Sequence, residues 1–151
     1  MKELSLHILD VAKNSVKAGA TLTEISVLTA ADGIMTVKIK DDGCGMSEET
    51  VKNVMNPFYT TRTTRNVGLG VPLLKLAAEQ TGGGIEIQSV SENDSPDSHG
   101  TTVTAEFFKN HLDFTPLGDV ISTVTTLIQG NPEIEWRFVH EINGQSVELN
   151  T

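Results

Sequence analysis

Hydrophobic positions along the first third of the chain follow two different periods. Residues 1–18 space their apolar side chains three and four apart, which predicts a helix that ends at Gly19. Residues 23–29 and 33–40 instead alternate apolar and polar side chains, which predicts two strands joined by an Asp-Gly turn. The N-terminal pattern therefore predicts a helix followed by a β-hairpin.

The predicted first helix gathers polar side chains on the stripe opposite its apolar face. A solvated surface is the simplest interpretation of such a stripe. Asn14 is a poor helix former in mid-helix, however, and it stands between acidic and basic residues, which also fits a functional site. The stripe consists of Glu3, His7, Asp10, Asn14 and Lys17.

A carboxylate continues the apolar face of the second predicted strand. Counting on by two from Ile39 gives Asp41, at a position where the next core residue is expected. A buried carboxylate is costly unless a donor meets it, and Gly43 and Gly45 lack a Cβ, which permits close approach. The stretch fits a pocket for a flat ligand that carries an amine, such as adenine. A turn with a solvated Asp is an equally good interpretation of this motif alone.

The rest of the chain alternates short helices with further hairpins. Ser47 is an expected N-cap for a helix through Val54, and a glycine-rich entry precedes a helix to about Gln80. Strands are expected over 85–90 and 101–107, and the second of these places Thr101 on the same layer as Asp41. The last elements are a helix over 116–129, capped by Thr115, and a hairpin that contains Trp136, Phe138, Val147 and Leu149.

Two features could hold an anion. Residues 60–66 are polar and include Arg62 and Arg65, which form a local basic cluster. Gly68, Leu69 and Gly70 lead directly into a predicted helix N-terminus, a common site for phosphate groups. A lone G-x-G is weak by itself, since many helices begin after glycine.

Composition limits the classes of function. With 151 residues and 38% hydrophobic content, the chain suits one soluble globular unit. A net charge of −9 argues against general binding to nucleic acid or to anionic membranes. There is no apolar run long enough to span a membrane, and the single cysteine favours a reducing, cytoplasmic location.

The order of these motifs resembles the Bergerat-fold (GHKL) ATPases, a family that includes gyrase B, histidine kinases, mismatch-repair ATPases and ninety-kilodalton heat-shock chaperones. An Asn on the first helix is followed by D-x-G-x-G, a Pro-Phe-Tyr-Thr-Thr-Arg loop, G-L-G before a helix, and Gly-Thr before a strand. The resemblance implies an α+β fold. It is a two-layer α/β sandwich whose mixed, mostly antiparallel sheet is covered by helices on one face.

The resemblance also implies roles for individual residues. Asn14 would ligate a Mg²⁺ that bridges the triphosphate of ATP, with Lys17 near the phosphates. Asp41 would accept a hydrogen bond from the adenine amine, and Gly43 and Gly45 would give clearance. Asp10 stands where hydrolytic members carry a general-base Glu, although its reach is one methylene shorter. Further contacts are implied for Thr101 with adenine, for Gly68, Leu69 and Gly70 with the phosphates, and for Arg62 and Arg65 in the lid over ATP.

The resemblance covers only part of the chain. It implies an ATP-binding domain over 1–110 and leaves 111–151 as a C-terminal helix-hairpin extension, expected to pack in the same domain and extend or cover its sheet. The strands that often precede the first helix are absent from the sequence, as is a helical hairpin with a phospho-accepting histidine. We interpret His7 as a pocket-edge or structural residue, and Cys44 as a small packing residue.

Three functions remain open at this point. The first is a protein kinase that phosphorylates a partner protein, as small anti-sigma-factor kinases of the family do. The second is a slow ATPase that acts as a nucleotide-controlled switch. The third is a non-catalytic ATP-binding subunit. The sequence leaves open the partner's identity and the oligomeric state, which includes a homodimer.

Overall fold

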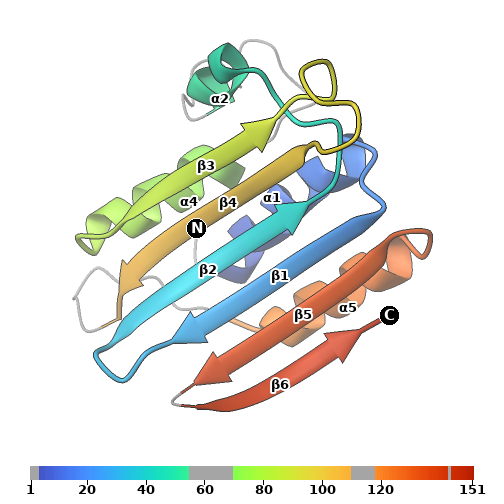
Figure 1. Ribbon diagram of the computed structural model, residues 1–151. Helices are drawn as coiled ribbons and strands as arrows, with labels where there is room; N and C mark the ends of the chain where they lie inside the picture. The colour runs from blue at the N-terminus through green and yellow to red at the C-terminus, as the bar shows by residue number, and fades with distance from the viewer. Residues whose placement is uncertain (1–3, 55–69, 110–117, 143) are drawn as a thin grey trace.

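One hairpin forms the centre of the sheet. β1 (Leu22–Thr29) and β2 (Ile34–Asp41) pair antiparallel, with Ile25 opposite Ile39, as their alternating patterns predict. Gly33 closes the turn at a φ of 90°, a conformation that glycine adopts without steric cost. The computed structural model describes residues 4–54, 70–109, 118–142 and 144–151, and it is shown in Figure 1.

The sheet has six strands in the order β3-β4-β2-β1-β5-β6. β3 (Gly84–Val90) and β4 (Gly100–Phe108) form the predicted second hairpin, and β4 pairs antiparallel with β2. β5 (Glu135–Ile142) and β6 (Gln145–Asn150) form the third hairpin. β5 joins the sheet by pairing parallel with β1, so the sheet is mixed and mostly antiparallel.

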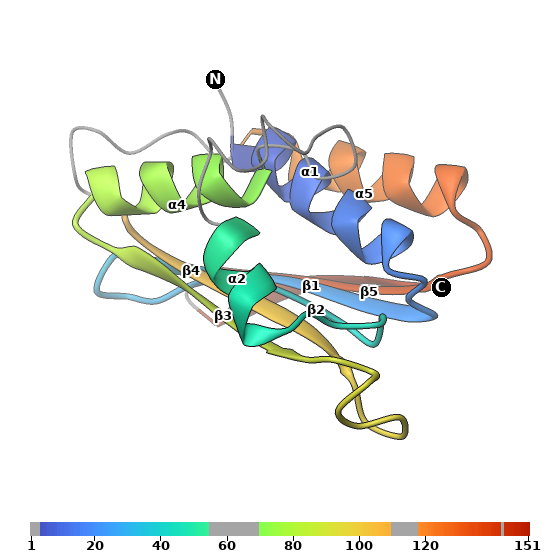
Figure 2. The same ribbon diagram turned by 90° about the horizontal axis from the view of Figure 1, so that it is seen from above.

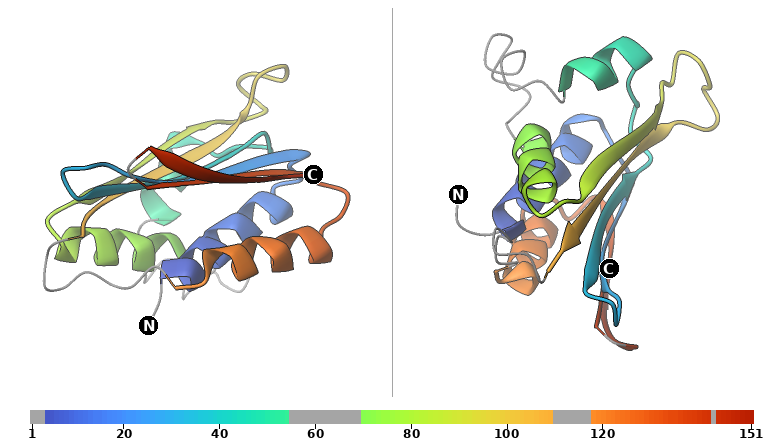
Figure 3. Two further views of the ribbon diagram at one scale, coloured as in Figure 1. Left: turned by 90° about the horizontal axis from the view of Figure 1, so that it is seen from below. Right: turned by 90° about the vertical axis from the view of Figure 1, so that its left-hand side faces the viewer.

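Three helices cover one face of this sheet. α1 (Leu4–Lys17), α4 (Gly70–Gln80) and α5 (Val120–Gly130) lie in one layer, as Figure 2 shows from above. The opposite face carries no helix in the described part of the chain, which is plain in the two views of Figure 3. The short α2 (Glu48–Val54) lies near β3. This arrangement confirms the predicted two-layer α+β fold.

The helix ends follow local chemistry. The amide of Ala20 donates to the carbonyl of Ser15 and that of Gly19 to Val16, which with a φ of 76° at Gly19 gives a glycine C-cap for α1. Ser47 caps α2, accepting from the amide of Thr50 at 3.2 Å. Both ends agree with the sequence prediction.

The predicted start of α5 is wrong. The helix begins at Val120, and the N-cap is Asp119, whose Oδ1 accepts from the amide of Ser122 at 2.9 Å. Gly118 has a φ of 77°, which a right-handed helix does not contain, so the helix does not run through this position. Thr115 and Pro116, the predicted cap and first helical residue, lie outside the described residues.

The core lies between the helices and the sheet and continues across all three hairpins. Its largest fully buried side chains include Phe107 of β4 and both Trp136 and Phe138 of β5. The indole of Trp136 is also satisfied, because Nε1 donates to the carbonyl of Asn131 at 3.1 Å. The C-terminal hairpin thus shares a sheet and a core with the strands before it. The division of the chain into 1–110 and 111–151 stays a prediction.

Candidate functional site

A cavity of about 570 Å³ opens between α1 and the sheet, at the end where β2 leaves it. Its apolar wall is formed by side chains from α1, α4 and three strands: Val11, Ile39, Val71, Ile87 and Val103. Its polar groups gather on α1 and at the ends of β2 and β4: Asn14, Ser15, Lys17, Asp41 and Thr101. A concave, largely apolar cavity with a few convergent polar groups is the usual form of a small-molecule site.

The carboxylate of Asp41 is held in this cavity by two donors. Its Oδ2 accepts from the hydroxyl of Ser15 at 2.6 Å, and its Oδ1 accepts from the amide of Gly43 at 2.8 Å. Asp41 is the last residue of β2 and continues the buried face of Ile39, as the alternation predicts. The last residue of β2 therefore places a carboxylate in the cavity, where an apolar core side chain would otherwise lie.

Thr101 lies opposite Asp41 in the pairing of β2 with β4. Its hydroxyl is 2.8 Å from that of Ser89 on β3, and the Ser89 hydroxyl also accepts from the amide of Met46 at 2.8 Å. The prediction that Thr101 and Asp41 share a layer is confirmed. These contacts join the ends of β3 and β4 to the loop that follows Asp41.

The glycines of that loop allow the protein to pack against itself. A Cβ at Gly43 would lie 2.7 Å from the Cβ of Ala18, and a Cβ at Gly45 would lie 1.8 Å from the carbonyl oxygen of Val90. We expected these glycines to give clearance to a ligand. The groups that approach them in the structure are Ala18, directly after α1, and Val90 at the end of β3, although Gly45 still lines the cavity.

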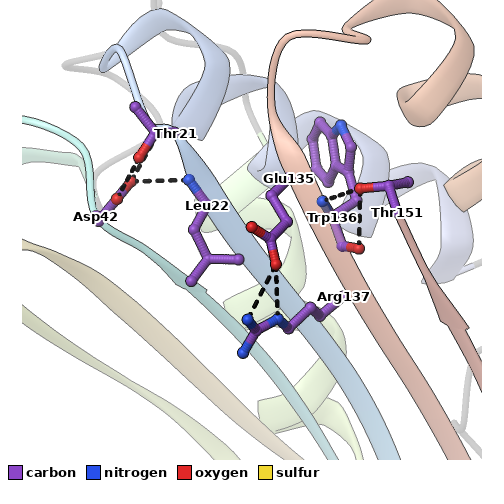
Figure 4. Close-up of polar contacts among 7 residues, drawn as sticks. All are labelled: Thr21, Leu22, Asp42, Glu135, Trp136, Arg137 and Thr151. Carbon is purple, nitrogen blue, oxygen red and sulfur yellow. Dashed lines mark hydrogen bonds and ion pairs between the residues drawn. The ribbon is translucent and has the colours of Figure 1, made fainter.

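Several further bonds fix the loop. The carboxylate of Asp42 accepts from the Thr21 hydroxyl and from the amides of Thr21 and Leu22 (Figure 4). Burial raises the pKa of Asp42, but these hydrogen bonds together outweigh it and hold the pKa below its ordinary value. On the other side, the Nδ1 of His99 donates to the carbonyl of Gly43. The loop is therefore anchored to both β1 and the start of β4.

The polar stripe of α1 is only partly a surface. Asn14 is half-buried and lines the cavity, and Lys17 is exposed at the same cavity. Asp10, half-buried one helical turn before Asn14, does not line it. His7 is 2% exposed and its Nδ1 has no partner among the described residues, so it is not part of a solvated surface, which agrees with its interpretation as a structural residue. Burial lowers the pKa of His7, which favours the neutral imidazole.

Asn14 fits the expected role of a magnesium ligand. Its amide oxygen is a hard donor, and it faces the same cavity as Lys17. Mg²⁺ usually takes one or two protein side chains and completes its shell with phosphates and water. The described residues hold no cluster of three His, Cys, Asp or Glu side chains that could hold a metal ion by itself.

Some predicted site residues lie outside the described part. Arg62, Arg65, Gly68 and Leu69 fall within 55–69, and their predicted roles stay predictions. Gly70 is the first residue of α4, which agrees with a glycine entry to that helix.

Sequence reasoning missed several residues of the cavity. Ser15 follows Asn14 by one position, so its side chain is turned by about 100° around the helix, away from the polar stripe and toward the core. Cys44, Met46 and Thr50 also line the cavity, and nothing in their spacing indicated it. The strand alternation did indicate two of the wall residues. Ile39 lies two positions before Asp41 on β2, and Val103 lies two positions after Thr101 on β4, so each shares a face with its polar neighbour.

Residues 2–125 match the family model described as histidine kinase-, DNA gyrase B-, and HSP90-like ATPase. A putative sensor protein of Shewanella frigidimarina is 31% identical over 91 residues, which cover 58% of this chain and 14% of that protein. Sporulation kinase C of Bacillus subtilis is 30% identical over 90 residues, which cover 58% of this chain and 20% of that protein. The chain thus spans a fifth or less of the length of these relatives.

A solved structure extends the similarity to the whole fold. The ATPase domain of MutL from Aquifex aeolicus, complexed with ADP, superimposes with a TM-score of 0.64 at 15% identity. The superposition covers 99% of this chain and 64% of that one, so the hairpin of β5 and β6 is within it. At this identity the likeness concerns the fold.

Proposed function

This chain belongs to the histidine kinase-, DNA gyrase B-, and HSP90-like ATPase family, and we propose that it binds Mg-ATP in the cavity at Asp41 and phosphorylates a partner protein. The observation that carries the proposal is the Asp41 carboxylate, fixed by two donors inside a largely apolar cavity. Such a site suits a flat aromatic ring with an amine at its edge, which adenine provides.

The proposed nucleotide would run from the base site toward α1. Adenine would contact Asp41, with Thr101 beside it, and the apolar walls would cover its faces. The phosphates would lie toward Asn14 and Lys17, because these two side chains bring an amide and a cation to the same cavity. Mg²⁺ at Asn14 would neutralise phosphate charge and orient the transferring group.

Kinase activity is proposed from the relatives, whose names include a sporulation kinase and sensor histidine kinases. The chain spans only part of those proteins, so the transfer of phosphate to a partner protein is our proposal.

In the part of the chain that the structure describes, no helix is long and apolar enough to cross a membrane. A cytoplasmic location and a partner other than nucleic acid remain part of the proposal.

Slow hydrolysis is the second candidate, with Asp10 as its proposed base, although Asp10 does not line the cavity itself. This carboxylate is half-buried on α1, one turn before Asn14. A base there could activate water near the proposed phosphates, although the shorter side chain limits its reach.

One experiment separates these functions. The protein is incubated with Mg²⁺ and ATP labelled on the γ-phosphate, alone and with cell extract. Label appearing on a protein of the extract supports the kinase. Phosphate release by the protein alone supports the ATPase, and if Asp10 is the base, Asp10→Asn should reduce that rate by about 10²- to 10⁴-fold. Nucleotide binding without either reaction would favour a non-catalytic subunit, and no binding at all would contradict the whole proposal.

A second measurement tests the metal site. Asn14→Ala should bind ADP with the same affinity in the presence and absence of Mg²⁺, whereas the unchanged protein should bind more tightly with the metal. Equal dependence on Mg²⁺ in both proteins would exclude Asn14 as the ligand.

A further inference from the structure

Ser15 is buried on α1 and lines the cavity of the proposed base site. It is 2% exposed, and its Oγ lies 2.6 Å from Oδ2 of Asp41. A carboxylate can only accept in such a contact, so the single hydroxyl proton of Ser15 points at Asp41. The residue belongs to a helix that packs against both α4 and α5, which fixes where its side chain can reach.

The second donor completes the restraint. The amide of Gly43 holds Oδ1 of Asp41 at 2.8 Å, so each carboxylate oxygen has one fixed partner. With a single donor the carboxylate could rotate about its Cβ–Cγ bond. With two donors from different segments, its plane and its remaining lone pairs keep one direction.

We propose that Ser15 is a positioning residue that sets the preference of this site for adenine over guanine by holding Asp41 as a fixed acceptor. The inference rests on the proposed function. A fixed acceptor requires a donor on the base, and the 6-amino group of adenine supplies one. Guanine bound in the same orientation presents a carbonyl oxygen at that place, and two acceptors facing each other leave both unpaired.

Loss of the Ser15 hydroxyl frees one carboxylate oxygen. Asp41 can then turn away from the carbonyl of guanine, or meet a different edge of the base. Adenine then binds less tightly, because it loses a well-placed acceptor. Guanine binds with a smaller unfavourable free energy, because its carbonyl oxygen no longer faces a fixed acceptor. The variant therefore changes the ratio of the two affinities, which a general loosening of the fold would not do.

Calorimetric titration with Mg-ADP and Mg-GDP tests this inference on the full chain. Ser15→Ala should raise the Kd for ADP about 2- to 10-fold, the size expected for one hydrogen bond, and lower the preference for ADP over GDP by a similar or larger factor. Ser5→Ala is the matched control, because Ser5 is also 2% exposed on α1 but does not line the cavity. It should leave the preference unchanged.

Two conservative variants test the inference if Ser15→Ala does not fold. Ser15→Thr keeps the hydroxyl, and it should retain the preference of the unchanged protein; Ser15→Cys has a weaker donor, and it should give an intermediate preference. A folded Ser15→Ala or Ser15→Cys protein with the unchanged preference would overturn the inference while leaving the proposed function intact. An unchanged protein that binds neither nucleotide would overturn both.

Discussion

Asp42, the residue after β2, is hydrogen-bonded to Thr21, the residue before β1. Its Oδ1 accepts from the Thr21 amide at 2.7 Å, and its Oδ2 accepts from the Thr21 hydroxyl at 2.6 Å. The neighbouring residue, Asp41, points its carboxylate into the cavity instead. Two consecutive carboxylates thus have different roles: Asp42 fixes the loop, and Asp41 faces the proposed ligand.

The Asp42 contacts predict a pH-dependent contribution to stability. The pKa of Asp42 is held below its ordinary value, so its contribution is present above the unfolded pKa of about 4 and is lost as the pH falls through the lower folded pKa. Asp42→Ala should cost about 1 kcal/mol at pH 7, a value discounted for partial exposure. Urea unfolding at pH 7 and near pH 3 checks it. A cost that is equal at both pH values would contradict the role of the charge.

The close contact at Gly45 predicts a large cost for a single added methyl group. Gly45 has a φ of 73°, and a Cβ there would lie 1.8 Å from the Val90 carbonyl oxygen. Gly45→Ala should destabilise the protein by more than about 2 kcal/mol, because strain and displacement of β3 add.

Gly144 is the matched control for that variant. Its φ is 85°, and no atom of the described residues beyond its chain neighbours lies within 4 Å of the position of its Cβ. Gly144→Ala should therefore show only the backbone cost, about 1 kcal/mol. Thermal or urea unfolding measures both variants. Equal costs would mean that the contact with Val90 does not matter.

Burial of Phe138 predicts that the C-terminal hairpin unfolds together with the rest of the chain. Phe138 is fully buried on β5, which pairs with β1. Phe138→Ala should cost about 3–5 kcal/mol in one cooperative transition. The neighbouring Arg137 is half-exposed and forms a surface ion pair with Glu135, so Arg137→Ala should stay within about 0.5 kcal/mol. If 111–151 were a separate docking module, Phe138→Ala would leave the unfolding of the other strands unchanged.

The sequence predicted the parts of this site that follow strand periodicity. Counting along β2 placed Asp41 on the buried face, and the same count along β4 placed Thr101 beside it. Local chemistry likewise predicted the ends of α1 and α2, because Gly19 and Ser47 act through their immediate neighbours.

Features that depend on tertiary packing could not be predicted from local sequence patterns. The bond between Ser15 and Asp41 joins residues 26 positions apart, and no local pattern indicates it. His7 is buried although helical spacing aligns it with polar residues. At α5, Thr115 and Pro116 gave a strong start signal, but the left-handed Gly118 and the cap at Asp119 set the described start of the helix.

Calorimetric titration of ADP into the unchanged protein and into Asp41→Asn tests the central claim most directly, that this cavity binds an adenine nucleotide through Asp41. The account predicts saturable binding to the unchanged protein, weakened about 10- to 100-fold in the variant, since an amide can present a donor where the base requires an acceptor. The variant must remain folded, as its melting temperature without ligand will show. Equal affinity in the two folded proteins, or no binding to the unchanged one, would contradict the account.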